Sequence, residues 1–296
     1  MDNKSDSSMH NQDLLPLKKE VGFFIALTFF FSAFFYYFIA TIEDDGWYEF
    51  GLMWCPGVAA VITSLLFNKN LKGFGWGIGS SWLLLASYFY PLAELFLVYG
   101  IVWYFGFGGF AGFDANFMTK LAFLPMILMA LEGTYYAGRS ALGEEIGWRG
   151  YLVPRLLSAY KPNTVSIFVG LVWAVWHFPI MITGDYGSNT PLLYQLICFT
   201  LAFVGVSFIY TWFRIKSGSL WTAALLHTSG NLFIFHVFED LTINTGNTAY
   251  YTGETGAVFA LWGLVLIFLF MRFGWDWPTT FYRFLRSKWC NNSQIS

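Results

Sequence analysis

The chain of 296 residues is 56% hydrophobic and 22% aromatic, but only 11% of its residues are charged. A soluble domain carries about 25% charged residues, so this composition excludes an ordinary water-soluble surface. The net charge of -2 and the lack of a Lys/Arg run exclude a nucleic-acid partner, whose phosphates need a basic patch. Cys55, Cys198 and Cys290 form no C-x-x-C pair, so the cysteines indicate no zinc or redox motif.

Hydrophobic segments of about 20 residues, the length that crosses a bilayer, recur along the whole chain. They predict an all-α fold, a polytopic membrane helix bundle with about eight transmembrane helices. Residues 1–20 are predicted to be a polar N-terminal tail, residues 21–273 a single membrane domain, and residues 274–296 a basic cytoplasmic C-terminal tail. The eight predicted spans are 21–42, 50–67, 82–105, 119–140, 164–183, 191–213, 219–238 and 255–272.

The distribution of Lys and Arg predicts the orientation, because these residues accumulate in cytoplasmic loops. With a cytoplasmic N-terminus, 15 of the 16 basic residues, Arg139 and Arg149 included, fall on the inner side and only Lys120 lies outside. Nine acidic residues fall in the outer loops. Because the number of spans is even, both termini are expected to be cytoplasmic in this integral, multi-pass protein.

Ionisable residues within the apolar segments cost free energy and therefore need a partner, a wet cavity or a function. On a helix Glu145 faces Arg149 four residues later, whereas Glu144 points about 100° away and has no evident cation. An unpaired carboxylate suits general-base work, so we assign chemistry to Glu144 and a supporting role to Glu145 and Arg149. An interfacial ion pair with a second, solvated Glu is the alternative.

Two further sites lie in later spans. His177 stands in an otherwise apolar segment, where it is either a hydrogen-bonded packing residue or a ligand. His227 and Asn231 share one helix face, and such a pair stabilises an oxyanion or joins two helices. A Glu base, a His and a His/Asn pair on three separate elements form a complete set for hydrolysing an amide by activated water.

In this order the residues resemble the CAAX-protease and bacteriocin-processing (CPBP) family of intramembrane endopeptidases, with the motifs E-E-x-x-x-R, F-x-x-x-H and H-x-x-x-N. The matching residues are Glu144-Glu145-x-x-x-Arg149, Trp173-x-x-x-His177 and His227-x-x-x-Asn231, within a motif core of 141–231. Trp173 replaces the family's Phe, a change that we expect to leave the chemistry unaltered.

The resemblance implies proteolysis inside the membrane, with water activated by Glu144 and His177 and an oxyanion stabilised by His227 and Asn231. It also leaves open a catalytic Zn²⁺ held by Glu144, His177 and His227. We prefer the metal-free mechanism, with no required cofactor, because Glu144 then remains the base. The implied partner is a peptide or membrane-protein substrate, lipidated in some cases, and a bacterial cell membrane is the expected location.

The rival hypothesis is a non-enzymatic membrane protein, either a proton-coupled small-solute transporter or an immunity or scaffold protein. Glu94 and Glu132 line a substrate path or bond neighbouring helices, and His236 is expected at the membrane interface. One difficulty concerns depth, because His177 lies deep in its predicted span and Glu144 near the cytoplasmic boundary. The segment 141–163 therefore extends the fourth span, lies on the surface or re-enters the membrane, and the cavity is expected to open toward the cytoplasm.

Overall fold

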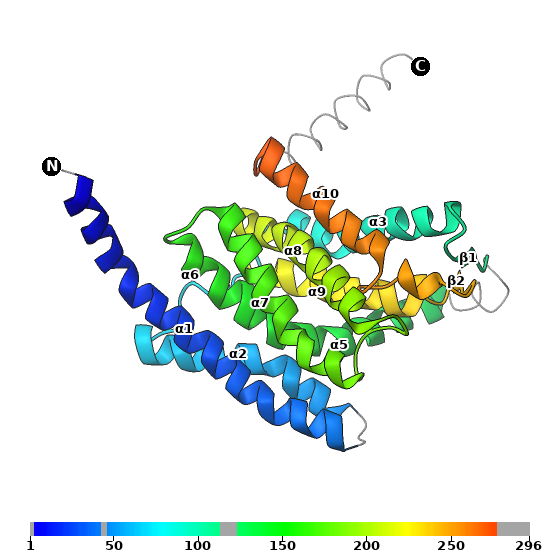
Figure 1. Cartoon of the computed structure of the whole chain (residues 1–296), viewed down its shortest axis with the longest axis horizontal. Helices are drawn as coiled ribbons and strands as arrows, with labels where there is room; N and C mark the ends of the chain where they lie inside the picture. The colour runs from blue at the N-terminus through cyan, green and yellow to red at the C-terminus, as the bar shows by residue number, and fades with distance from the viewer. Residues whose placement is uncertain (1–2, 43–45, 113–122, 277–296) are drawn as a thin grey trace, which may run out of the picture.

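The computed structural model describes residues 3–42, 46–112 and 123–276 as one helical bundle with a single two-stranded sheet (Figure 1). In these residues β1 pairs antiparallel with β2, Gly109 opposite Ile243. The helices are α1 (Asn3–Thr41), α2 (Trp47–Asn68), α3 (Ser81–Tyr104), α5 (Phe123–Glu145), α6 (Val153–Leu157), α7 (Pro162–Thr183), α8 (Leu192–Ser217), α9 (Trp221–Phe233) and α10 (Ala257–Phe273). Shorter elements are the π-helical turns η1 (Ile146–Leu152) and η2 (Ile234–Phe238), the 3₁₀ turn η3 (Thr248–Tyr250), and the strands β1 (Gly109–Phe110) and β2 (Thr242–Ile243).

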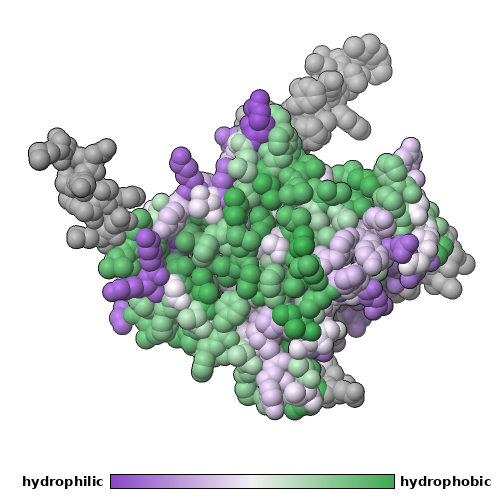
Figure 2. All heavy atoms as spheres, viewed as in Figure 1, coloured by the Kyte–Doolittle hydropathy of each residue, from purple (hydrophilic) through white to green (hydrophobic). Residues whose placement is uncertain are grey.

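Five helices in the described residues are long and apolar enough to cross a membrane, namely α2, α3, α7, α8 and the part of α1 from Leu14 to Thr41. The helix α10 is equally apolar but shorter. Hydrophobic side chains cover the middle of the visible face, and hydrophilic ones gather at its upper left and at its right (Figure 2). The predicted all-α polytopic membrane bundle is therefore confirmed, while the count of eight spans and the cytoplasmic position of both termini stay predictions.

The three predicted motifs lie on a central group of helices. In the described residues α5 packs between α2 and α9, α3 packs against α9, and α8 packs between α7 and α10. The helix α8 is buried along most of its length, from Gln195 to Arg214. The three motif-bearing helices α5, α7 and α9 therefore pack against several others, and Glu144, His177 and His227 are buried between them.

The fourth predicted span, 119–140, is displaced along the chain. The helix α5 continues past residue 140 to Glu145, then through the π-helical turn η1 into α6, which ends at Leu157. Every residue of η1 is buried. This continuous helix places Glu144 well inside the bundle. In the described residues α5 is not among the helices that are long and apolar enough to cross a membrane, so the three alternatives for the segment 141–163 stay predictions.

A close approach of α2 fixes this helix in place. A Cβ atom added to Gly143 would lie 2.7 Å from the carbonyl oxygen of Met53, and one added to Gly147 would lie 2.5 Å from a side-chain atom of Pro56. Real Cβ atoms do not come so near, so only glycine allows the two backbones to touch at these positions. The residues on either side of Glu144 and Glu145 therefore lock the catalytic helix against α2.

Two of the basic residues counted for the orientation lie in helical segments and not in loops, Arg139 in α5 and Arg149 in η1. The guanidinium of Arg139 lies 4.8 Å from the centre of the Phe50 ring, near the start of α2, and Arg149 has no exposed surface. The reason is that α5 and η1 continue as one helix through this part of the chain. Residues 3–20 are helical and continue into the first span, whereas Lys120 and the tail from residue 277 onward lie outside the described residues.

Candidate active site

Three helices bring the four predicted catalytic residues to one cavity. Glu144 of α5, His177 of α7, and His227 and Asn231 of α9 all line it, and its volume is about 230 Å³. We call it the catalytic cavity. Its other lining residues are Ile39, Glu49, Met53, Ile180, Asp185, Tyr186, Phe203, Phe235 and Glu254.

Two indole groups hold one oxygen of the Glu144 carboxylate. The Nε1–H of Trp173 donates to Oε2 of Glu144 at 2.6 Å, and that of Trp148 donates to the same atom at 3.3 Å. The other oxygen, Oε1, lies 3.9 Å from Nε2 of His227. Both donors are neutral, so Glu144 has no cationic partner of the Lys or Arg type among the described residues, in agreement with the expectation from its position on the helix.

Trp173 makes a contact that the sequence analysis did not predict. Its replacement of the family's Phe was expected to leave the chemistry unaltered, but a Phe ring has no N–H group and cannot make the bond to Glu144. The same indole lies under the guanidinium of Arg149, 4.0 Å from the ring centre. Trp173 therefore orients the carboxylate as well as filling space.

Glu145 has different surroundings on the other side of the helix. Its Oε1 accepts a bond from the guanidinium of Arg149 at 2.8 Å, and both side chains are fully buried. The same Oε1 lies 3.0 Å from Nδ1 of His227. The helical spacing predicted the pair with Arg149, and the structure adds His227 to it.

The hydrogen bonds of the two histidines define their tautomers. Nδ1 of His177 lies 2.9 Å from the backbone oxygen of Trp173, and Nδ1 of His227 faces Glu145. A carbonyl or carboxylate oxygen only accepts, so both Nδ1 atoms carry hydrogen. Each Nε2 is then an acceptor in the neutral ring, and His227 donates from Nε2 only when its ring carries both protons.

The three donors of the zinc alternative do not form a metal-binding group. Among the described residues, no cluster of three His, Cys, Asp or Glu side chains is close enough to hold a metal ion. The 3.9 Å between His227 and Glu144 also exceeds the spacing of about 3.3 Å that two tetrahedral zinc ligands near 2.0 Å require. The present arrangement of Glu144, His177 and His227 therefore does not fit a zinc ion.

The catalytic cavity lies toward one face of the bundle. Its lining residues include Ile39 near the end of α1, Glu49 at the start of α2, Ile180 near the end of α7 and Glu254 just before α10. All of these are at the face opposite to the first residues of α1. The side of the membrane to which this face belongs, and with it the expected opening toward the cytoplasm, stays a prediction.

Sequence reasoning missed Tyr186 and Glu254 in the wall of the cavity. The hydroxyl of Tyr186 donates to Glu254, and its ring lies 5.8 Å from the ring of His177. Burial, together with the nearby carboxylate of Glu144, raises the pKa of Glu254 to about 8. No motif contains either residue, and the only signal in the sequence was an acid in a predicted outer loop.

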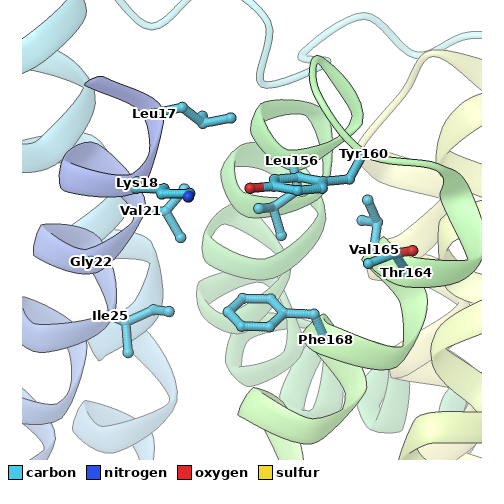
Figure 3. Close-up of a pocket in the computed structure, with 10 residues that line it drawn as sticks. All are labelled: Leu17, Lys18, Val21, Gly22, Ile25, Leu156, Tyr160, Thr164, Val165 and Phe168. Carbon is cyan, nitrogen blue, oxygen red and sulfur yellow. The ribbon is translucent and has the colours of Figure 1, made fainter. Parts of the chain in front are cut away.

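Other candidates lie elsewhere. Glu132 and His236 are exposed, and neither lines the catalytic cavity. A second cavity of about 340 Å³, between α1 and the helices α6 and α7, is almost wholly apolar and contains none of the predicted residues (Figure 3). Lys18 is the charged side chain among its labelled residues. This cavity offers no group that could activate water.

Comparisons with known proteins agree with the motifs. Residues 126–233, which contain all three motifs, match the family model described as type II CAAX prenyl endopeptidase Rce1-like. The CAAX prenyl protease 2 of Methanococcus maripaludis is 26% identical over 160 residues, which are 53% of this chain and 54% of that protein. The match thus spans about half the length of this archaeal relative, and the predicted bacterial source stays a prediction. By its matched segment and its ordered motifs, the chain is similar to the CAAX-protease (CPBP) family.

Proposed function

We propose that this chain is an intramembrane endopeptidase, CAAX-protease-like, that hydrolyses a peptide bond with water activated by Glu144 and His177. The observation that carries the proposal is the common cavity of Glu144, His177, His227 and Asn231. Its substrate is a peptide or a membrane-protein segment. We include in this proposal that the substrate is lipidated in some cases.

In the proposed reaction Glu144 takes a proton from water while the water oxygen attacks the carbonyl carbon of the peptide. The two indole donors fix Oε2 of Glu144, so Oε1 is the atom that receives the proton. Nε2 of His177 accepts a hydrogen bond from the same water. A positioned base of this kind contributes about 10²–10⁴ to the rate.

The negative charge that develops on the carbonyl oxygen needs hydrogen-bond donors. The side-chain amide of Asn231 supplies one, and Nε2 of His227 supplies a second when its ring is cationic, a state that Glu145 and Glu144 on its two sides favour by charge. When the C–N bond breaks, its electron pair stays on nitrogen, and Glu144 returns its proton to that amine. Glu145, which is paired with Arg149, accepts a hydrogen bond from Nδ1 of His227 and so fixes the position of the ring.

The test is cleavage of a peptide library by purified protein in liposomes, with the wild type compared with Glu144→Ala and His177→Ala. His236→Ala is the matched control, because His236 is exposed and outside the cavity. We expect loss of cleavage in the first two variants and wild-type rates in the control. Equal cleavage by all four proteins would refute the assignment.

We further propose that no metal ion is required. Cleavage that survives a strong chelator, in a preparation without stoichiometric zinc, supports the carboxylate mechanism. Cleavage that a chelator abolishes and Zn²⁺ restores would contradict it. Proton-dependent solute uptake without any cleavage, lost in Glu144→Gln, would instead support the transporter alternative.

A further inference from the structure

The apolar cavity between α1 and the helices α6 and α7 is separate from the catalytic cavity, and the two share no lining residue (Figure 3). We call it the α1–α7 cavity. Its volume of about 340 Å³ is within the range of about 300–1,000 Å³ that is typical of sites for small molecules. Gly22 and Phe168, one on each wall, are exposed and belong to apolar spans, so the cavity opens toward lipid.

The polar and apolar side chains of this cavity are separated along its length. Lys18 and Tyr160 lie near the beginning of the spans formed by α1 and α7. Ile25 and Phe168 lie further along the same two spans, where the walls are aliphatic or aromatic (Figure 3). A lysine near the end of a span reaches the membrane interface with its ammonium group. The cavity therefore has a polar end at the interface and an apolar end within the bilayer.

Contacts between α1 and α7 close the apolar end. The indole of Trp176 donates to Oγ of Ser32 at 2.8 Å, and the hydroxyl of Tyr36 donates to the backbone oxygen of Trp176 at 2.5 Å. The part of α1 that lines the cavity, from Leu17 to Ile25, is about 12 Å long at about 1.5 Å per residue. This space therefore fits part of an alkyl chain that extends from the polar end.

The groups at the polar end have no partner in the described part of the protein. Figure 3 shows the amine of Lys18 and the hydroxyl of Tyr160 pointing toward each other from opposite walls. Neither group makes a hydrogen bond or an ion pair with a described residue. No Asp or Glu is among the described lining residues, and Glu20 is buried and paired with Arg155 at 2.9 Å. The charge of Lys18 is therefore not neutralised by the residues around the cavity.

We propose that the α1–α7 cavity binds one anionic phospholipid of the surrounding bilayer. The phosphate lies between Lys18 and Tyr160, and the ammonium group and the hydroxyl both donate hydrogen bonds to its oxygens. One acyl chain lies along Val21, Ile25 and Phe168. The cavity and the lipid thus have the same order of charged, polar and apolar groups, and basic pockets between membrane helices bind anionic headgroups.

The charge at the polar end decides between the candidate lipids. An uncharged isoprenoid would leave Lys18 and Tyr160 without an acceptor. Phosphatidylcholine carries a cation beside its phosphate, which weakens the attraction to Lys18. An anionic phospholipid has neither disadvantage. The site is independent of the proposed function, because it requires neither Glu144 nor any other residue of the catalytic cavity.

The experiment measures lipid retention by full-length protein. Purified protein in detergent is mixed with equal amounts of dioleoyl phosphatidylglycerol, which is anionic, and dioleoyl phosphatidylcholine, and native mass spectrometry counts the lipids that remain bound to each chain. Lys18→Gln removes the charge, and Lys19→Gln is its matched control, because Lys19 is exposed and does not line the cavity.

A second pair of variants tests the apolar end. A Cβ atom added to Gly22 would meet no atom within 4 Å, and the same is true of Gly100 in α3, which does not line the cavity. Gly22→Leu therefore places a side chain beside the proposed acyl chain without a clash in the protein, and Gly100→Leu is the matched control. Leucine favours a helix more than glycine does, so neither change weakens its helix.

We expect the wild type to retain one phosphatidylglycerol per chain, with about a fivefold preference over phosphatidylcholine, the effect of one Lys near an anionic headgroup. Lys18→Gln lowers this preference toward one, whereas Lys19→Gln retains it. Gly22→Leu lowers the retention of both lipids about tenfold or more, the effect of excluding two or more methylene groups, and Gly100→Leu binds as the wild type does.

Three results would overturn the proposal. The first is equal retention of the two phospholipids by the wild type. The second is a preference that Lys18→Gln keeps, or a retention that Gly22→Leu leaves unchanged, since the lipid would then bind elsewhere. The third is displacement of the phospholipid by equimolar farnesol or oleate, which would assign the cavity to an isoprenoid or a free fatty acid.

Discussion

The helix that carries Glu144 and Glu145 has two sides with opposite properties. On the cavity side, neutral indoles of Trp148 and Trp173 hold Glu144 and leave one oxygen facing the catalytic cavity. On the buried side, Arg149 and His227 hold Glu145 away from that cavity. The carboxylates of Glu144 and Glu145 are neighbours in the sequence, but the first has neutral donors and the second has Arg149 as its partner. In the proposed mechanism the acid that is paired with Arg149 supports the site, and the acid with neutral partners transfers the proton.

The largest expected effect comes from removing the base on the cavity side. Glu144→Gln keeps an acceptor for both indoles but cannot take a proton, so kcat should fall by about 10³ or more with little change in thermal stability. Cleavage kinetics and a thermal melt in detergent measure the two quantities. Glu132→Gln is the control. A marked fall in the melting temperature of Glu144→Gln would show that this carboxylate also stabilises the fold, which would contradict the difference between the two sides.

The next effect concerns the buried side. Glu145→Gln leaves the guanidinium of Arg149 without its carboxylate, which we expect to cost about 3–5 kcal/mol of stability. The double variant Glu145→Gln with Arg149→Met removes both charges and should recover part of that loss. Thermal unfolding of the three proteins measures it. A double variant less stable than Glu145→Gln alone would contradict the role of this pair.

Asn231 tests the cavity side without touching the carboxylates. Asn231→Ala removes a proposed oxyanion donor and should lower kcat by about 10²–10³ while KM changes little. Asn163→Ala, at the start of α7 and distant from the cavity lining, serves as control. A rise in KM with kcat unchanged would indicate that Asn231 binds the substrate and does not stabilise the transition state.

Trp173→Phe has a smaller effect because it keeps the ring over which Arg149 lies and removes only the N–H group bonded to Glu144. We expect kcat to fall about tenfold, the value of one hydrogen bond to a charged group. Trp212→Phe, which removes an indole bond to the backbone of Trp275, is the matched control. Unchanged kcat would show that Trp148 alone orients the base.

The smallest effect is a pH dependence of stability at Glu254, beside Tyr186, Glu144, Asp185 and Glu239. Its pKa of about 8 lies above the unfolded value near 4.3, so the folded state binds this proton more tightly. That stability is complete below the unfolded pKa and disappears as the pH rises to about 8. The melting temperature should therefore fall more from pH 5 to 8.5 in the wild type than in Glu254→Gln. An equal fall in both proteins would contradict the raised pKa.

The sequence predicted the membrane bundle and the grouping of Glu144, His177, His227 and Asn231, because span length and i,i+4 spacing are local properties. It ended the fourth helix at residue 140, whereas α5 runs to Glu145 and continues into η1, which is amphipathic in composition yet buried along its whole length. The indole bond of Trp173 and the contact of Tyr186 with Glu254 join elements distant in the chain. No local pattern encodes such contacts.

The π-helical turn η1 accommodates one residue more than a regular α-helix would in the same place. A π turn contains about one residue more than an α turn, so deleting a single residue between Ile146 and Leu152 would let the helix relax to the α form. Because the π turn absorbs the extra residue, α6 and the connection to α7 would keep nearly their present faces relative to the residues before Glu145. In natural variation, a deletion of one residue in this turn should therefore be tolerated more readily than an insertion.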